Sequence, residues 1–342
     1  MSKNQATPQD VYHAYRLLLG REPDDGGYAH FCALIETRAL SAMELSWEFL
    51  YSDEFRQKQG VLTHVDSGVK PKPGVVMLGS KACTQADIES PAFRYWSTCL
   101  RDRPGMLHRK PWEWCFIVQA LYERGVLADG RRGLGFAVGQ EPLSALFASL
   151  GCRIVASDIG HDGADDAGWI ATNQHASSLI QLNSRGICAD GVFAERVALR
   201  EADMRRIPSD LRGFDFIWSA CALEHLGGLR QGMEFVLDAM DCLAPGGVAV
   251  HTTELNCESD RSTVEHGHSV IYRRRDLSEL AELLRARGHS IEPFDFDLGG
   301  TEADGFVDEP PYNGRTHLKL RVDGYVTTSF GLIIRKASAS MP

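Results

Sequence analysis

Two segments near the middle of the chain place ionisable side chains directly after apolar, strand-like runs. Glu224 and His225 follow one such run, and His251 and Glu254 stand at the end of the next. Imidazole titrates near neutral pH, so either histidine could take a proton from a hydroxyl group. We therefore predict Glu224, His225 and His251 as catalytic residues and Glu254 as an acceptor-binding residue. The alternative is that each histidine only packs and hydrogen-bonds inside the fold.

The same region is rich in side chains of the types that bind metals. Carboxylates and imidazoles occur at positions 224, 225, 251 and 254, and again at His266 and His268. No pair has an established spacing such as His-Glu-x-x-His, and His266-x-His268 falls in a predicted loop. The prediction from the sequence is therefore that no metal is bound.

A glycine-rich turn precedes these segments. A short strand leads into this turn within residues 133–139, and a helix begins near Pro142. A second strand, 153–157, ends at Asp158. Glycines let the backbone approach a ligand, the start of a helix offers free N–H groups, and a carboxylate beyond the second strand accepts two ribose hydroxyls. By itself, the turn also fits a nicotinamide dinucleotide loop.

Further elements decide between these cofactors. A third strand, 197–202, leads into Asp203 and Met204, where a carboxylate can accept from an adenine amine while a thioether packs on the ring. A fourth strand, 213–220, is followed by a helix and by the turn Pro245-Gly246-Gly247. The remaining predicted strands are 248–253, 291–296 and 324–335. The last follows a loop instead of a crossover helix, so it can run antiparallel.

In this order and spacing, the segments resemble the motifs of class I methyltransferases that depend on S-adenosyl-L-methionine. The matches are Gly135–Gly139, Asp158, Asp203-Met204, Phe214–Ile217 and Leu243–Gly247, within residues 130–337. The resemblance implies an α/β fold with a Rossmann-like, seven-stranded mixed sheet whose last strand is antiparallel, and S-adenosyl-L-homocysteine as product. The implied cofactor-binding residues are Gly135, Phe136, Ala137, Gly139, Glu141, Asp158, Ile159, Asp203, Met204, Ser219 and Ala220.

Two positions depart from this family pattern. The family often has an acidic residue two positions before the first glycine, where it meets the amino group of the methionine, but here that position is Gly133. Another carboxylate must then serve, and Glu141 and Glu113 are the candidates. The middle glycine of the motif is replaced by Ala137, which is also small.

The stretch between the last two predicted strands is acidic and aromatic. Residues 299–312 contain four carboxylates and Tyr312, and His317 follows closely. Sugars present hydroxyl donors and flat apolar faces, so we predict Asp308, Tyr312 and His317, with Glu254, as residues that bind a polyhydroxylated acceptor. The alternative is a solvated acidic loop.

The N-terminal part of the chain has helical periodicity without catalytic spacing. The segments 15–24 and 51–55 resemble a short helical domain of unknown function that is often fused to bacterial glycosyltransferases and surface-polysaccharide enzymes. We predict a small all-α module over 8–59, a linker over 60–89, a helical lead-in over 90–129, and the methyltransferase domain over 130–337.

Composition limits the possible partners and location. The 342 residues carry a formal charge of −10, which disfavours bulk nucleic acid as a partner. No apolar run is long enough to span a membrane. Nine cysteines without a Cys-x-x-Cys pair indicate free thiols in a reducing compartment, so we expect a cytoplasmic protein.

The sequence thus predicts an O-methyltransferase acting on a sugar or surface-glycan precursor, with a histidine as base. A natural-product methyltransferase with a small-molecule acceptor is the first alternative. A catalytically silent fold that docks a glycan-assembly enzyme through the N-terminal module is the second. The Asp203-Met204 and Pro245-Gly246-Gly247 features disfavour a nicotinamide oxidoreductase.

Overall fold

A computed structural model describes residues 5–55, with gaps at 39, 51 and 53, and then 73–160, 178–312 and 316–338. The chain forms two compact units, Met1–Lys72 and Pro73–Pro342. The smaller unit contains α1 (Pro8–Leu18), α2 (Asp25–Arg38) and α3 (Ala42–Leu50). Its core is aromatic: the Tyr15 ring lies edge-on to Phe49 at 4.8 Å, and Phe31 stacks on Phe49 at 4.2 Å.

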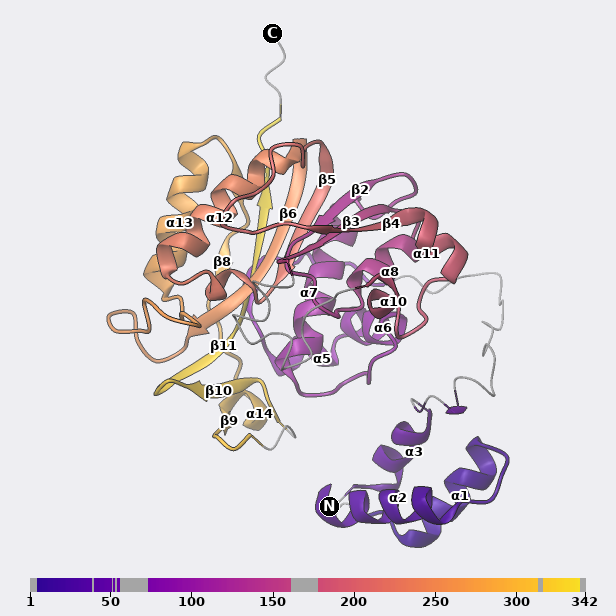
Figure 1. The fold of residues 1–342 in the computed structure, drawn as a ribbon. Helices are drawn as coiled ribbons and strands as arrows, with labels where there is room; N and C mark the ends of the chain where they lie inside the picture. Colours follow the sequence, from indigo (N-terminus) through magenta and orange to yellow (C-terminus); the bar gives the residue numbers. More distant parts are fainter. Residues whose placement is uncertain are drawn as a thin grey trace. The chain divides into compact units, whose positions relative to one another are not determined.

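The larger unit is built on one mixed sheet (Figure 1). Five neighbouring strands are parallel, and β11 (Tyr325–Arg335) runs antiparallel beside the last of them. The predicted Rossmann-like sheet with an antiparallel last strand is therefore confirmed. In spatial order the parallel strands are β4 (Val197–Glu201), β3 (Arg153–Asp158), β2 (Arg132–Gly135), β5 (Phe214–Ala220) and β6 (Leu243–Asn256).

The described residues form eleven strands, more than the seven predicted. The predicted strand 291–296 is divided at Pro293, which has no N–H to donate, into β7 (Ser290–Ile291) and β8 (Phe294–Asp295). Two further strands, β9 (Val307–Asp308) and β10 (Lys319–Val322), extend the sheet beside β11.

The remaining strand, β1 (Ser80–Ala82), lies inside the stretch predicted as a linker. It pairs antiparallel with β11 and parallel with β8. Upstream of it, the Glu123 carboxylate accepts hydrogen bonds from the backbone N–H groups of residues 76–78, at 2.7–3.1 Å. Because of these contacts, the larger unit begins at Pro73, and residues 73–89 belong to it.

Two helical layers cover the sheet (Figure 1). On one face, α7 (Arg109–Glu123) and α8 (Leu143–Ser149) pack against Phe216 and Trp218. On the other, α12 (Leu229–Ala239) and α13 (Arg274–Ala286) pack against Ile217 and Ala249. The shorter elements are α5 (Gln85–Glu89), α6 (Pro91–Cys99), α10 (Leu179–Leu182), α11 (Asp190–Arg196), η1 (Leu223–His225), η2 (Met240–Cys242) and α14 (Glu302–Gly305).

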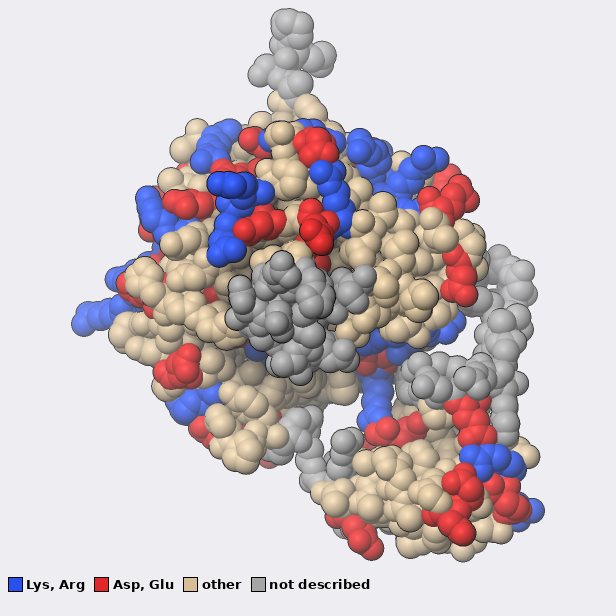
Figure 2. Space-filling model, viewed as in Figure 1, with Lys and Arg blue, Asp and Glu red and all other residues tan. Residues whose placement is uncertain are grey.

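The surface does not concentrate one sign of charge on the face seen in Figure 2, where basic and acidic side chains are interspersed. Among the described residues, no helix is both long and apolar enough to cross a membrane.

Candidate active site

The carboxyl ends of β2, β3, β5 and β6 meet at one edge of the sheet, where open α/β sheets bind their ligands. The strand register brings Gly135 beside Ala156 and Trp218, and Ala220 beside Thr252. Gly135, Asp158 and Ala220 therefore stand at the ends of neighbouring strands along this edge.

The glycine-rich loop turns sharply after β2. Ala137 and Gly139 both adopt left-handed backbone conformations, with φ of +47° and +49°. The Asp158 carboxylate lies against this loop and accepts hydrogen bonds from the Gly139 N–H at 3.1 Å and the Ile159 N–H at 2.9 Å. Phe136, in contrast, is fully buried and packs edge-on against Phe235 of α12. We name the loop 135–139 together with Asp158 the cofactor half.

The missing family acid at position 133 has a steric explanation. A Cβ atom on Gly133 would lie 2.4 Å from the Phe216 ring, so no side chain fits there. Glu141, at the far end of the loop, is buried and accepts a hydrogen bond of 2.5 Å from the indole N–H of Trp218. Burial raises the pKa of Glu141 to about 8.

The predicted adenine-binding pair is divided between surface and core. Asp203 forms an ion pair with Arg205 at 3.1 Å, which helps to hold the pKa of Asp203 low although partial burial opposes this. Met204 is buried with the residues that pack under α12. Of this pair, only the Asp203 carboxylate is partly exposed.

A group of charged residues comes from the start of α7, and of these the sequence singled out only Glu113. The Lys110 ammonium donates to Glu113 at 2.9 Å and lies 3.4 Å from the carbonyl of Ala220 at the end of β5. Arg109 forms an ion pair with Glu254. Positions 109, 110 and 113 recur at helical spacing, and this spacing in the sequence was the one signal that could have identified them.

Glu113 connects this group to the antiparallel strand β11. It is 1% exposed and accepts a hydrogen bond of 2.6 Å from the Ser329 hydroxyl of β11. Burial alone would raise the pKa of Glu113, but the charges of Lys110 and Arg109 outweigh it and leave this pKa below its ordinary value.

Three side chains from β5, η1 and β6 lie next to these cations. A ligand atom of Cys221, of Glu224 and of Glu254 lies within 4.8 Å of each of the others. Burial, followed by the charge of Glu254, raises the pKa of Glu224 to about 8, and the Thr253 hydroxyl donates to this carboxyl at 3.1 Å. We name Arg109, Lys110, Glu113, Cys221, Glu224 and Glu254 the charged cluster.

Cys221 occupies an unusual position in this cluster. It directly follows β5 with φ of +48°, a region that L-residues other than glycine, asparagine and aspartate seldom adopt. Its backbone N–H donates to the Thr252 hydroxyl at 3.0 Å. Burial and the carboxylates of Glu113 and Glu224 raise the pKa of the Cys221 thiol well above its usual value.

The two predicted catalytic histidines have different environments. His225 ends η1, and its Nδ1 lies 2.9 Å from the carbonyl oxygen of His268, so Nδ1 carries the proton and Nε2 is the basic nitrogen. Burial lowers the pKa of His225, which favours the neutral imidazole.

His251 lies on the opposite face of the sheet from Glu254 and Arg109. It is fully buried, contacts the Phe235 ring of α12, and its Nδ1 lies 2.8 Å from the Ser219 hydroxyl. Burial lowers the pKa of His251 to about 3. His251 and Ser219 thus pack under α12, and their predicted roles in the site stay predictions.

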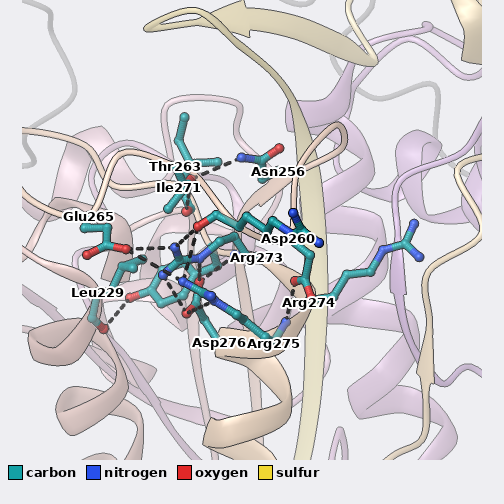
Figure 3. Close-up of polar contacts among 12 residues, drawn as sticks. Leu229, Asn256, Asp260, Thr263, Glu265, Ile271, Arg273, Arg274, Arg275 and Asp276 are labelled. Atoms are coloured by element: carbon teal, nitrogen blue, oxygen red, sulfur yellow. Dashed lines mark hydrogen bonds and ion pairs between the residues drawn. The ribbon is translucent and has the colours of Figure 1, made fainter.

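The loop that contains His268 is fixed by one buried arginine. Arg273 is 4% exposed and pairs with Asp276 at 2.7 Å and with Glu265 at 2.7 Å, as Figure 3 shows. It also donates to the carbonyl of Arg261 at 2.8 Å. These bonds anchor both ends of the loop, so the carbonyl that orients His225 is held in place.

The predicted acceptor loop contains a carboxylate–imidazole pair, Asp308 and His317. Asp308 is fully buried, and its carboxylate lies 2.6 Å from Nδ1 of His317. The backbone of His317 accepts from the Arg109 N–H at 3.0 Å, which places the loop beside the start of α7. Tyr312 is 47% exposed and contacts the His317 ring edge-on at 5.4 Å. Asp308 therefore positions His317, whereas Tyr312 is open to solvent.

The fold is similar to those of solved methyltransferases. A protein from Galdieria sulphuraria assigned as a sarcosine dimethylglycine methyltransferase is 16% identical over 66% of this chain and 84% of its own, with a TM-score of 0.41. DhpI in complex with SAH is 17% identical over 75% of this chain and all of its own, with a TM-score of 0.37.

An S-adenosylmethionine-dependent methyltransferase from Methanosarcina mazei is 13% identical over 64% of this chain and 98% of its own, with a TM-score of 0.39. No family model and no curated protein sequence matches the chain.

Proposed function

We propose that the chain is an S-adenosyl-L-methionine-dependent O-methyltransferase whose acceptor is a sugar or glycan precursor. The observation that carries this proposal is the placement of Asp158. A carboxylate at the end of β3, held by two backbone N–H groups against a left-handed glycine loop, is the arrangement that receives a ribose diol. The charged cluster lies further along the same edge, where the acceptor would meet the methyl group.

The residues of this edge divide the work of holding the cofactor. Asp158 would accept the ribose hydroxyls, and the backbone of the loop would approach the nucleoside. Lys110 would pair with the carboxylate of the methionine, and Glu113 or Glu141 with its ammonium group, because these side chains converge beside Ala220 at the end of β5. The cofactor, when bound, supplies an electrophilic methyl group.

The protein must then align the acceptor hydroxyl and remove its proton. We assign Nε2 of His225 as the base that takes the proton of the acceptor hydroxyl. The carbonyl of His268 fixes the tautomer of the ring, and burial keeps the ring neutral. His225 would hold the acceptor oxygen toward the methyl group that the bound cofactor would supply. The products are the methyl ether, S-adenosyl-L-homocysteine and a proton that leaves through His225.

The polyhydroxylated acceptor is inferred from the side chains beyond β6. Glu254 and His317 offer a carboxylate and an imidazole to hydroxyl groups, and the half-exposed Tyr312 ring offers a flat apolar face. A product screen with nucleotide sugars, oligosaccharides and small phenols tests this part. Methylation confined to the phenols would replace the sugar by a natural-product acceptor.

Calorimetry tests the cofactor. We expect S-adenosyl-L-homocysteine to bind and NAD to give no heat. Asp158→Ala should weaken S-adenosyl-L-homocysteine binding by about 10- to 100-fold, since a hydrogen bond to a charged group contributes about 1.5–3 kcal/mol. Asp210→Ala, at an exposed ion pair with Arg200, is the matched control and should leave the affinity unchanged. Absence of heat with S-adenosyl-L-homocysteine would contradict the proposal.

The smaller unit would dock an enzyme of glycan assembly. It has its own core and no catalytic cluster among its described residues, and it exposes Leu17 and Met43 at 81% and 72%. Leu17→Glu with Met43→Glu should reduce co-purification of a glycosyltransferase from native cells and leave S-adenosyl-L-homocysteine binding intact. Unchanged co-purification would remove this role.

A further inference from the structure

Three residues of the charged cluster have the geometry of a metal site. Cys221, Glu224 and Glu254 each offer a ligand atom, and these atoms all lie within 4.8 Å of one another. In a tetrahedral zinc site with bonds of about 2.1–2.3 Å, two ligand atoms are about 3.4–3.8 Å apart. Small side-chain rotations would therefore bring all three ligand atoms onto one ion.

A second observation comes from the Glu254 carboxylate. Its Oε1 is engaged by Arg109, whereas its Oε2 is buried and has no hydrogen-bond partner among the described residues. Glu254 is 5% exposed, so bulk water does not replace the missing partner. Buried carboxylate oxygens are almost always hydrogen-bonded or bound to a cation, and an unsatisfied one in a binding edge indicates a ligand.

Once Glu224 and Cys221 are ionised, the charges of the cluster match a cation of charge +2. Glu113, Glu224 and Glu254 contribute three negative charges when ionised, and Arg109 and Lys110 contribute two positive ones. A thiolate at Cys221, which is the form that binds metals, adds one more negative charge. The sum is −2, so one divalent ion makes the buried group neutral.

We propose that Cys221, Glu224 and Glu254 bind one divalent transition-metal ion of the zinc type. A thiolate among the ligands favours zinc, cobalt or iron over magnesium and calcium. Three protein ligands leave a coordination position open. Since the cluster lies where the proposed methyl transfer occurs, an oxygen of the acceptor can take this position, and that last step rests on the proposed function. The protons of Cys221 and Glu224 are released to solvent when the metal binds.

The sequence predicts no metal because its motifs require closely spaced ligands. Cys221 and Glu224 flank a single turn after β5, whereas Glu254 comes from the next strand, thirty residues further along the chain. Only the pairing of β5 with β6 brings the three together.

The test uses the full chain after treatment with a chelator. Titration with Co²⁺ alone should produce a thiolate-to-cobalt absorption band in the near ultraviolet, at one ion per chain, and Zn²⁺ should displace it. Cys221→Ser should abolish the band, and Glu224→Gln or Glu254→Gln should weaken Co²⁺ binding by at least 10-fold. Cys257→Ser is the matched control and should keep the band. Cys257 follows β6, the strand that contains Glu254, and lies outside the cluster.

A further variant separates loss of binding from loss of folding. Cys221 has φ of +48°, which glycine adopts without strain, so Cys221→Gly should fold at least as well as the native chain and still lack the band. The proposal is overturned if the native chain gives no band and no heat with Co²⁺ or Zn²⁺, or if Cys221→Gly retains the band. In that case protons on Cys221 and Glu224 neutralise the cluster.

Failure of this proposal and failure of the proposed function give different results. Calorimetry with S-adenosyl-L-homocysteine on the same metal-free sample reports on the cofactor half alone. Cofactor binding without metal binding leaves the methyltransferase proposal intact and removes the metal. Metal binding without cofactor binding supports the metal site and contradicts the methyltransferase proposal.

Discussion

The cofactor half and the charged cluster occupy neighbouring strand ends but use different chemical groups. In the cofactor half, backbone conformation dominates: Ala137 and Gly139 are left-handed, and Asp158 is held by backbone N–H groups. In the charged cluster, five ionisable side chains from α7, η1 and β6 surround Cys221. Under the proposed function, the backbone part receives the adenosine of the cofactor, and the buried charges determine what else enters.

This difference predicts opposite sensitivities to mutation. Breaking a buried ion pair leaves a charge without compensation, which affects stability strongly, while a change of backbone strain has a small effect on stability and a larger one on ligand approach. Substitutions in the two places therefore test whether the division is real.

The largest effect is expected at the ion pair of the charged cluster. Arg109→Met leaves Glu254 buried and uncompensated and should lower the free energy of unfolding by about 3–5 kcal/mol. Arg109→Met combined with Glu254→Met should restore most of this loss, because no unpaired charge remains. Urea denaturation of the three proteins is the measurement. A double variant no more stable than Arg109→Met would show that packing, and not charge, is responsible.

The next effect is expected in the cofactor half. Gly135→Ala places a Cβ atom 2.4 Å from the Trp218 ring and 2.5 Å from Val138, so we expect a loss of about 1–3 kcal/mol together with weaker S-adenosyl-L-homocysteine binding. The control is Gly191→Ala in α11, where a Cβ atom meets open space and the helix should gain up to about 1 kcal/mol. Thermal unfolding and calorimetry measure both. Equal effects from the two substitutions would rule out the steric explanation.

A pH-dependent effect on stability is expected from Glu141, which lies at the far end of the glycine-rich loop. Its folded-state pKa of about 8 exceeds that of an unfolded chain, so between about pH 4.5 and 8 the folded state retains a proton that the unfolded state has lost. The contribution of Glu141 to stability therefore declines as the pH rises through this window, by up to about 1.4 kcal/mol per pH unit. Glu141→Gln should become more stable relative to the native chain as the pH rises. Parallel stability curves from pH 5 to 8 would contradict the raised pKa.

The smallest effect is expected from Ala137→Gly. Glycine removes a left-handed strain of about 1–2 kcal/mol but loses about 0.5–1 kcal/mol of backbone entropy, so the net change in stability should stay below about 1 kcal/mol. Cofactor affinity should be retained. Ala137→Val, which adds a β-branched side chain at positive φ, should instead lose stability. If thermal unfolding ranks valine at or above alanine, the loop is not held in this conformation.

The cofactor half and the parallel strands could be predicted because their signals are local. Apolar runs, glycines and the acid at 158 follow one another along the chain, and each strand needs only its own sequence to be recognised. The strand β1 escaped prediction because Ser80-Lys81-Ala82 has no apolar run and gains its partners from residues 294–331.

The sequence named Glu113, Glu224 and Glu254, but Arg109, Lys110 and Cys221 escaped prediction for a related physical reason. Arg109 and Glu254 lie 145 positions apart, and nothing local marks either as a partner of the other. Likewise, whether a histidine faces the site or the core depends on strand register. Glu254 and His251 stand three positions apart on β6 and therefore project from opposite faces, which is why His251 packs under α12.

The position of β1 also constrains how the chain folds during synthesis. Lys81 pairs with Gly331, so β1 can pair with β11 only after a further 250 residues have been synthesised. Until β11 has emerged, the edges of β6 and β1 remain without their partner, and the sheet is open where Ser329 would hold Glu113. The core of the smaller unit consists of its own residues, so this unit can fold first. The hydrogen bond from Ser329 to Glu113 therefore forms only after β11 has been synthesised.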